Sequence, residues 1–262
     1  MNKHKQHGFS TLFVAAGIAL LGVIAFATVT IQNKNDNTKT KESTQAVTNA
    51  AENSSKKQSD DLVLQNVGLD TFDNILYDKH ALSAYKTDGL KGFYYFGDSL
   101  PGARKNPNFE FSSLKEGTKI IAAIDGTITF IKEQSESSDK EVFLQTSENS
   151  QWIIGYGHLV NVTVKKGDKV KVGDVLGEPG VQNNGLRRFE FQVNRKQSGQ
   201  DDIHVCPSTL VAPAAKDALL QSLSTMMQKW NTTAGESIYD LTIQTPIGCL
   251  LDTLTPQQAQ GI

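Results

Sequence analysis

The stretch YGHLVNVTVKKGDKVKVGDVLGEPG, residues 156–180, constrains the fold more than any other part of the sequence. Valines alternate with polar residues around two Gly-Asp dipeptides, at 167–168 and 173–174. Such alternation is typical of strands that bury one face, and Gly-Asp is typical of tight turns. The stretch therefore predicts short strands joined by tight turns.

Similar segments extend this pattern over the middle of the chain. They are rich in β-branched and aromatic residues and are separated by clusters of Gly, Asn, Asp or Ser. Near-helical spacing of apolar residues follows at 212–230. We therefore expect a mainly β domain at 63–212, a sandwich or barrel, and a C-terminal helix and tail at 213–262. Residues 63–90 fit either a helix or a strand. The predicted strands are 119–131, 140–146, 151–159, 160–166, 169–177 and 188–194.

The N-terminal segment, residues 1–31, is predicted to anchor the chain in a membrane. A basic start, MNKHKQHG, precedes an uncharged apolar run from Phe9 to Ile31. At about 1.5 Å per residue, a helix of this length spans a hydrocarbon core of about 30 Å. Lysines before the run favour a cytoplasmic N-terminus. We expect a single-pass inner-membrane protein whose C-terminal domain lies in the periplasm.

Two other interpretations of this segment stay open. Ala25 and Ala27 fit the cleavage site of a signal peptide. KQHGFSTLF resembles the Gly-Phe processing site of type IV prepilins, although Phe13 stands where mature pilins usually carry Glu. That resemblance implies a pilus-associated, pilin-like protein.

Residues 32–62 are polar and contain no aromatic residue. Such a segment cannot bury enough apolar surface to offset its ordering entropy, so it is predicted to be a disordered linker. The whole chain has 26 Lys and Arg against 28 Asp and Glu, a net charge of −2. This balance gives no basic surplus for nucleic acid, and no nucleic-acid partner is expected.

The two cysteines, Cys206 and Cys249, are expected to form a disulfide, since an exported domain folds in an oxidising compartment. Free buried thiols are the alternative. On the chain-entropy model, closing a loop of this length stabilises the fold by roughly 4 kcal/mol. The bond would tie the C-terminal tail to the main domain.

Five stretches occur in an order that a known family shares. They are YYFGD (94–98), GTKIIAAIDGTI (117–128), YGHL (156–159), VKKGDKVKVGDVLGEPG (164–180) and RFEFQV (188–193). With them the chain resembles the lysostaphin/LytM-type zinc endopeptidases, which cut peptide cross-links of bacterial cell wall. The resemblance implies a LytM-like barrel-sandwich hybrid β domain. Lipoyl carriers use a similar hairpin but need an exposed lysine at its tip, whereas Lys169 follows Asp168 within the turn.

The resemblance also places the family's site on this sequence. Two His and one Asp hold zinc in the family, and their positions correspond to Tyr94, Asp98 and Glu190 here. The two assisting His correspond to His158 and Arg188. Only Asp98 and His158 keep the family's residue type. Because tyrosine titrates near pH 10 and arginine stays protonated, we expect no metal, no other cofactor, and a His158 that no longer catalyses.

Strand periodicity puts Arg188, Glu190 and Gln192 on one face of their strand. With Tyr94 and Asp98 they would line the former active-site groove. There, the Arg188 guanidinium could fill the vacated cation position between carboxylates, or it could form a solvated surface pair. Between Asp98 and Gly117 the chain is longer than the family's pattern, which predicts a loop at the groove edge.

The expected function is that of a membrane-anchored, catalytically inactive LytM-like protein. It would bind peptidoglycan, a cell-wall hydrolase or an envelope complex, as a regulator or scaffold. The alternative is an active zinc peptidoglycan endopeptidase with altered ligands, which would have to recruit His80 or His204.

Overall fold

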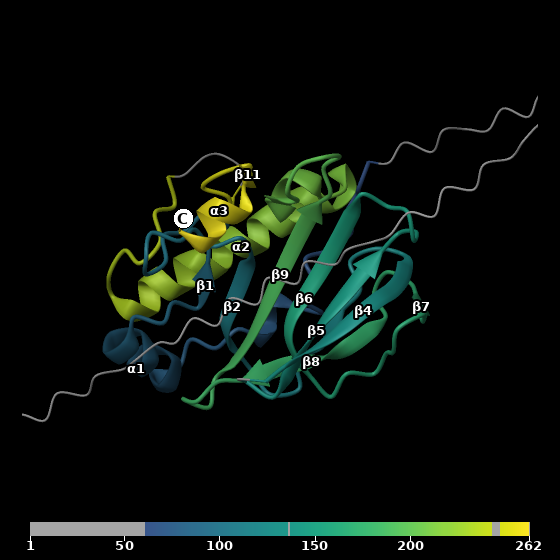
Figure 1. Ribbon diagram of the computed structural model, residues 1–262. Coiled ribbons are helices and arrows are strands. Elements are labelled where there is room, and N and C mark those ends of the chain that lie inside the picture. Colours follow the sequence, from purple (N-terminus) through teal and green to yellow (C-terminus); the bar gives the residue numbers. More distant parts are fainter. Residues whose placement is uncertain (1–60, 136, 243–246, 262) are drawn as a thin grey trace, which may run out of the picture. The chain divides into compact units, whose positions relative to one another are not determined.

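The computed structural model of the protein describes residues 61–135, 137–242 and 247–261. The predicted membrane segment and nearly all of the predicted linker lie outside these ranges. Inside them, no helix is both long enough and apolar enough to cross a membrane. The described chain is mainly β, as predicted, with one large sheet and a long C-terminal helix (Figure 1).

The sheet contains eleven strands, and each pairing between these strands is antiparallel. Its main order is β1-β2-β9-β8-β6-β5-β4-β7, and β9 also pairs directly with β6. β3 joins at β8, β10 at β9, and β11 at β10. The strands are β1 Phe93–Tyr94, β2 Phe109–Leu114, β3 Ile120–Ile121, β4 Gly126–Gln134, β5 Asp139–Gln145, β6 Trp152–Val160, β7 Lys169–Val170, β8 Val175–Val181, β9 Arg187–Arg195, β10 Ile203–Val205 and β11 Thr253–Leu254.

Strand β9 shows how the core forms. Its alternate residues Phe189, Phe191 and Val193 are fully buried, while Arg188, Glu190 and Gln192 on the opposite face are only partly buried. Phe189 and Phe191 pack on Tyr156 of β6. The Tyr156 hydroxyl accepts a hydrogen bond from the Ala123 backbone N–H at 2.9 Å. Removing one such ring typically costs about 3–5 kcal/mol.

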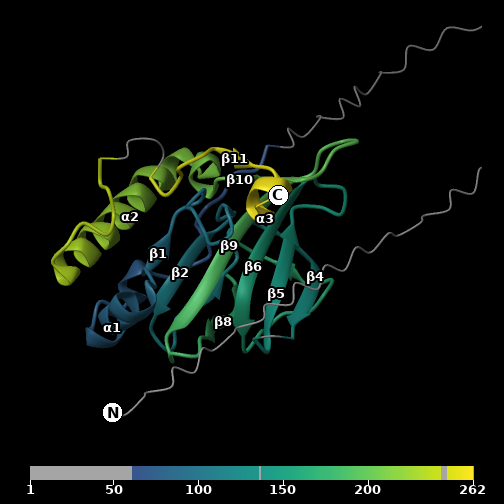
Figure 2. The ribbon, with the colours of Figure 1, turned by 60° about the vertical axis from the view of Figure 1, so that its left-hand side comes forward.

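The C-terminal helix α2, Pro213–Ala234, begins with Pro213 in the first turn and ends at Gly235 in the left-handed conformation. It lies beside the β1–β2 end of the sheet and near α1, Lys79–Asp88 (Figure 2). The Tyr95 hydroxyl contacts the Met227 sulfur at 3.0 Å, and Tyr77 packs on Trp230. The predicted C-terminal helix is therefore present and shares one core with the sheet. Its buried residues are Leu219, Leu223, Met226, Met227 and Trp230.

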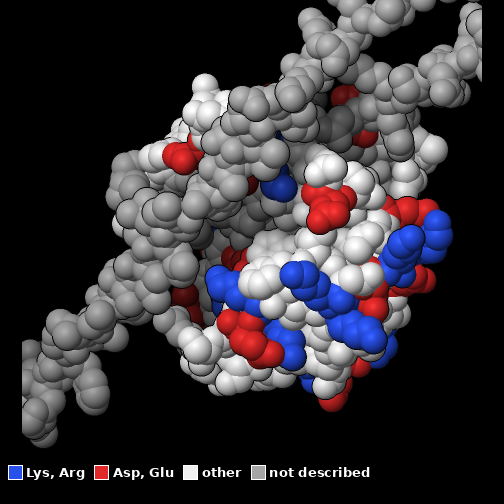
Figure 3. Space-filling view, turned by 45° about the vertical axis from the view of Figure 1, so that its right-hand side comes forward, with Lys and Arg blue, Asp and Glu red and all other residues white. Residues whose placement is uncertain are grey.

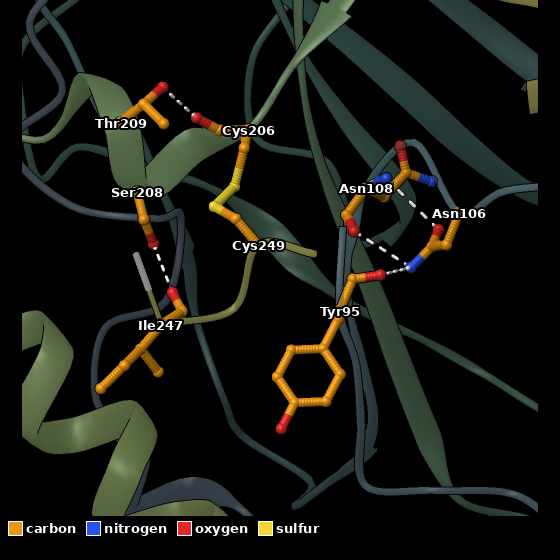
Figure 4. Close-up of a disulfide and its surroundings, with 8 residues drawn as sticks. All are labelled: Tyr95, Asn106, Asn108, Cys206, Ser208, Thr209, Ile247 and Cys249. Carbon is orange, nitrogen blue, oxygen red and sulfur yellow. Dashed lines mark hydrogen bonds between the residues drawn. A yellow bond between two sulfur atoms is a disulfide. The ribbon is translucent and has the colours of Figure 1, made fainter. Parts of the chain in front are cut away.

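The predicted disulfide between Cys206 and Cys249 is present, with the two Cα atoms 6.0 Å apart. Cys206 precedes a 3-10 turn, η2 Pro207–Leu210, and the tail beyond Cys249 continues into β11 and α3, Pro256–Gln260. The Ser208 hydroxyl donates to the Ile247 carbonyl, which adds a second tie beside the disulfide (Figure 4). The bond therefore fixes the tail against the sheet.

Two predicted strands differ from the structure. Residues 119–131 are not one strand, because a bend at residues 123–125 divides them into β3 and β4. Residues 160–166 form no strand beyond Val160. Asn161 adopts a left-handed conformation with φ of 48°, which ends β6, and the Asp168 carboxylate accepts from the Lys165 N–H to close the next turn.

The segment before the predicted strands is also resolved by the structure. Residues 63–90 hold a 3-10 turn, η1 Phe72–Asn74, and the helix α1, capped by the Asp78 carboxylate on the Ala81 N–H. The predicted groove-edge loop between Asp98 and Gly117 is wrong in its second half. Strand β2 lies there, and its alternate residues Phe109 and Phe111 are fully buried.

Candidate ligand-binding site

The site lies on the polar face of the sheet, the face of β9 that carries Arg188, Glu190 and Gln192. Strands β2 and β9 pair through the same tripeptide, Phe-Glu-Phe, at 109–111 and 189–191. The register sets Glu110 directly opposite Glu190, with buried phenylalanines on either side. Like charges directly opposite each other destabilise a sheet, so this pair needs a positive neighbour.

His158 reaches this face through an irregularity in β6. The register places Tyr156 opposite Val142 and Leu159 opposite Lys140, so three steps on β6 match two on β5. His158 lies inside this bulge with φ of 59°, a left-handed conformation that is uncommon for a residue with a side chain. The bulge turns the ring of His158 toward Glu190 while Tyr156 and Leu159 both stay buried.

The His158 ring is held between two carboxylates. Its Nδ1 lies 2.8 Å from Oδ2 of Asp139 and its Nε2 lies 3.3 Å from Oε1 of Glu190. Burial alone lowers the pKa of His158, but the hydrogen bond to Glu190, the charge of Glu190 and the bond to Asp139 outweigh it. The pKa of His158 is therefore raised, although Arg188 opposes the shift.

Two glycines make room for this arrangement. A Cβ on Gly157 would lie 3.2 Å from Cβ of Glu190, the residue directly opposite on β9. A Cβ on Gly180 of β8 would lie 2.9 Å from Oδ2 of Asp139 and 3.0 Å from the His158 carbonyl oxygen. The absence of side chains at both positions lets Asp139, His158 and Glu190 meet.

Arg188 supplies the positive charge beside the two glutamates. Its Nη1 lies 4.0 Å from Oε1 of Glu110, and its Nη2 lies 3.2 Å from Nδ1 of His158. Burial and the charge of Glu190 raise the pKa of Glu110 to about 7, against the lowering effects of Arg188, the Ser112 hydroxyl and His158. One guanidinium therefore compensates the two carboxylates only in part.

An open cleft of about 760 Å³ lies over His158 and Arg188. One wall comes from the end of β4 and the start of β5, the other from the turn between β8 and β9, and α1 contributes its C-terminal end. Elsewhere, on the face shown in Figure 3, lysines and arginines are mixed with acidic side chains.

The structure brings some of the predicted site residues together and leaves others apart. His158 meets both Arg188 and Glu190. Gln192 lies on the same face, where its amide oxygen accepts a hydrogen bond from Asn194. Tyr94 is one strand further away, opposite Glu110, and burial raises its pKa.

Asp98 takes part in a different contact. Its Oδ2 lies 3.3 Å from Nζ of Lys91, and among the described residues it makes no contact with Glu190. The carboxylate that β2 brings to Glu190 is Glu110. The repeated Phe-Glu-Phe pattern is the signal that could have identified it, since two alternating segments of this kind suit paired strands.

Two further residues were missed. Asp139 begins β5, and nothing local in the sequence marks it as a partner of His158. Asn108 precedes β2, and its side-chain amide donates to Oε2 of Glu190 at 2.8 Å. It follows Asn106, whose amide donates to the backbone of Tyr95 and Asn108 and so fixes the approach to β2 (Figure 4).

The residues present do not fit zinc. Zinc would need a neutral imidazole with a free ring nitrogen, whereas both nitrogens of His158 face carboxylates and the Arg188 guanidinium lies alongside. Within the described ranges, no group of three or more His, Cys, Asp or Glu side chains is arranged to hold a metal ion.

The other histidines do not complete the site. The Nε2 of His80 lies 2.7 Å from the Asn184 carbonyl oxygen, which joins α1 to the turn between β8 and β9. His204 pairs with Asn194, four positions along β9 from Glu190 and thus roughly 13 Å away at about 3.3 Å per residue.

Comparisons with known proteins find similarity over part of the chain. Residues 111–201 match the family described as peptidase family M23, which is normally zinc-dependent. The match excludes Tyr94 and Asp98 and includes His158, Arg188 and Glu190. No curated protein matches the chain.

Several solved structures of M23 proteins are similar to part of the chain. The catalytic domain of EnpA, a prophage-encoded protein from Enterococcus faecalis, is 21% identical, with a TM-score of 0.35, over 45% of this chain and 91% of that one. The catalytic domain of lysostaphin from Staphylococcus simulans is 21% identical, with a TM-score of 0.33, over 41% and 80%. LytU is 28% identical, with a TM-score of 0.33, over 42% and 74%.

Proposed function

Residues 111–201 form a peptidase family M23 domain, and from this premise we propose that the protein is a non-catalytic peptidoglycan-binding member of that family. The proposal places the binding site in the cleft above His158 and Arg188. On this proposal the ligand is the same as in the family, the peptide part of bacterial cell wall, but the protein does not cleave it.

One observation carries the proposal: Arg188 stands beside His158, Glu110 and Glu190, so a guanidinium occupies the site's cationic position. An arginine cannot accept a proton near neutral pH. His158 offers no free lone pair either, because each ring nitrogen already faces a carboxylate, and its raised pKa favours the protonated form. The described residues of the cluster therefore offer no free base to activate a water molecule.

The cleft itself remains open to a ligand. Its walls are rich in amides and hydroxyls, which suit a peptide backbone. Their side chains come from Ser135, Ser137, Ser138, Gln182, Asn183 and Asn184. Loss of the reaction therefore leaves the binding surface in place.

The cellular setting belongs to the same proposal. The apolar run from Phe9 to Ile31 would anchor the protein in the inner membrane, and residues 32–62 would let the domain reach the wall from the periplasmic side. A domain held in this way can recruit or regulate a cell-wall hydrolase or an envelope complex at the peptidoglycan to which it binds.

The test uses the full-length protein, purified in mild detergent, with isolated cell-wall sacculi. We expect the protein to sediment with the sacculi and to release no soluble peptide, with or without added zinc. Lysostaphin serves as the positive control for release. Zinc-dependent release that a chelator stops would show an active peptidase, and failure to sediment would exclude wall binding.

A further inference from the structure

We infer that the Arg188 guanidinium anchors a carboxylate of the ligand, so that the cleft takes a short peptide bearing a free carboxylate. This inference rests on the proposed function and specifies the ligand of the same cleft. It starts from the hydrogen-bond partners of Arg188, which lines the cleft with about a third (32%) of its side chain exposed.

The Arg188 guanidinium has more N–H donors than it has acceptors within reach among the described residues. An arginine presents five N–H donors in a planar fork that matches a carboxylate. Among the described residues, Glu110 is 4.0 Å from Nη1, beyond hydrogen-bond distance, and only Nδ1 of His158 is closer, at 3.2 Å from Nη2.

The contact with His158 is not a good hydrogen bond for Arg188. The same Nδ1 lies 2.8 Å from Oδ2 of Asp139, a shorter and charge-assisted contact. One ring nitrogen cannot both donate to Asp139 and accept from Arg188. Arg188, which lines the cleft, therefore has no strong acceptor among the described residues, and a ligand carboxylate could accept two parallel bonds from its fork.

The charges around the cleft permit an anionic group to approach. Lys132 lines the wall and is only loosely paired, with its Nζ 3.8 Å from Glu141. Of the acidic residues on the lining, Glu133 is neutralised by Lys140 at 2.8 Å, and Asp139 is buried against His158. Asp88, from the end of α1, also lines the cleft and opposes an anion, as do Glu190 behind His158 and Glu110, 4.0 Å from Nη1 of Arg188. We expect the bidentate bond to Arg188 to outweigh all three.

The ligand probe is N-acetyl-D-alanyl-D-alanine, compared with its C-terminal amide, which has the same shape without the charge. We expect the free acid to bind the full-length protein about tenfold or more tightly than the amide, a difference of about 1.4 kcal/mol. A second probe, an N-acetylglutamic acid blocked as its α-amide, carries its only carboxylate on the side chain. Preference for one acid over the other identifies the source of the carboxylate.

Variants locate the effect. Arg188→Gln should abolish the preference for the acid, and Arg188→Lys should keep part of it, because lysine retains the charge without the fork. Arg187→Gln is the matched control. Arg187 is the neighbouring arginine, but it binds the Pro179 carbonyl and Glu116 and does not line the cleft.

The outcomes separate the inference from the proposed function. Equal binding of acid and amide by the unaltered protein overturns the inference, whatever the variants do, and so does the absence of peptide binding by a protein that sediments with sacculi. Failure to bind either peptides or sacculi overturns the proposed function as well. A preference for the acid that Arg187→Gln keeps and Arg188→Gln loses supports the inference.

Discussion

A histidine lies near each end of strand β9: His158 belongs to β6 and His204 to β10. Their surroundings shift the pKa values of the two rings in opposite directions. At one end, His158 lies between Asp139 and Glu190, and its pKa is raised. At the other end, His204 faces the neutral amide of Asn194; burial lowers its pKa, and Asp202 only partly offsets the effect. Burial opposes charge at both ends, and only the carboxylates reverse its effect.

This difference predicts opposite responses to pH. A histidine whose pKa is raised by folding stabilises the fold fully below its unfolded pKa of about 6.5 and loses that contribution as pH rises through the folded pKa. A histidine whose pKa is lowered does the reverse, because the unfolded chain binds the proton more readily. We therefore expect the His158 end to be stabilised by mild acid and the His204 end to be destabilised by it.

The largest expected effect on stability comes from a change near the His204 end of the sheet. Replacing Cys206→Ala and Cys249→Ala together removes the bond that fixes the tail and β11 next to β10. We expect the free energy of unfolding to fall by about 3–4 kcal/mol, nearly equally at pH 5 and pH 8, because no titrating group is lost. Denaturant unfolding measures it, and reductant should weaken the unaltered protein but not the variant. A loss below about 1 kcal/mol would mean that packing alone holds the tail.

The second prediction concerns the carboxylate pair at the His158 end. Glu110 has a folded pKa of about 7, above its unfolded value, so its ionisation costs stability as pH rises from about 4.5 to 7. Glu110→Gln should therefore stabilise the protein by about 1–3 kcal/mol at pH 8 and by little at pH 4.5.

Thermal melts across this pH range measure the effect of Glu110→Gln. The matched control is Glu116→Gln, since the Glu116 side chain is 88% exposed and pairs only with Arg187. A gain that is equal at both pH values would contradict the raised pKa of Glu110, which burial and the charge of Glu190 cause.

The third prediction tests the space that holds the His158 cluster together. Gly180→Ala would press a methyl group against Asp139 and the His158 carbonyl, and we expect a loss of about 1–2 kcal/mol with displacement of His158 from Asp139. Gly155→Ala is the control, since its Cβ would lie 3.6 Å from its nearest neighbours, an ordinary contact. Equal losses, measured by denaturant unfolding, would show a general cost of changing glycines in the sheet.

The smallest effect compares the two rings directly. Titration of the imidazole signals by NMR should place the pKa of His158 above the ordinary value and that of His204 below it. In Asp139→Asn, the pKa of His158 should fall while that of His204 stays unchanged, because the two rings lie at opposite ends of β9. Shifts in the same direction at both rings would refute the comparison.

Several features followed from local sequence. Alternation in 188–194 predicted both faces of β9, and the Gly-Asp dipeptides marked the turns before β7 and β8. Helical spacing over 212–230 predicted α2, and the presence of two cysteines predicted the disulfide between them. These features succeed because burial of a strand or helix face repeats with the period of the element, and a chain with two cysteines has one possible pairing within itself.

The site itself depended on contacts that no local pattern encodes. The family resemblance assigned Tyr94 and Asp98 to the groove, but the register of β2 against β9 puts Glu110 opposite Glu190. Likewise, Asp139 reaches His158 only because β5 pairs with a bulged β6 and Gly180 leaves space between them.

The sequence by itself therefore determined which residues line each face of the strands, and with them the sheet, the long helix and the disulfide. Only the tertiary structure decided which charged groups meet, because strand register and one bulge turn residues distant in the chain toward a common point. At that point the pKa of each group depends strongly on its neighbours, which is why the raised pKa of His158 could not be predicted from its motif.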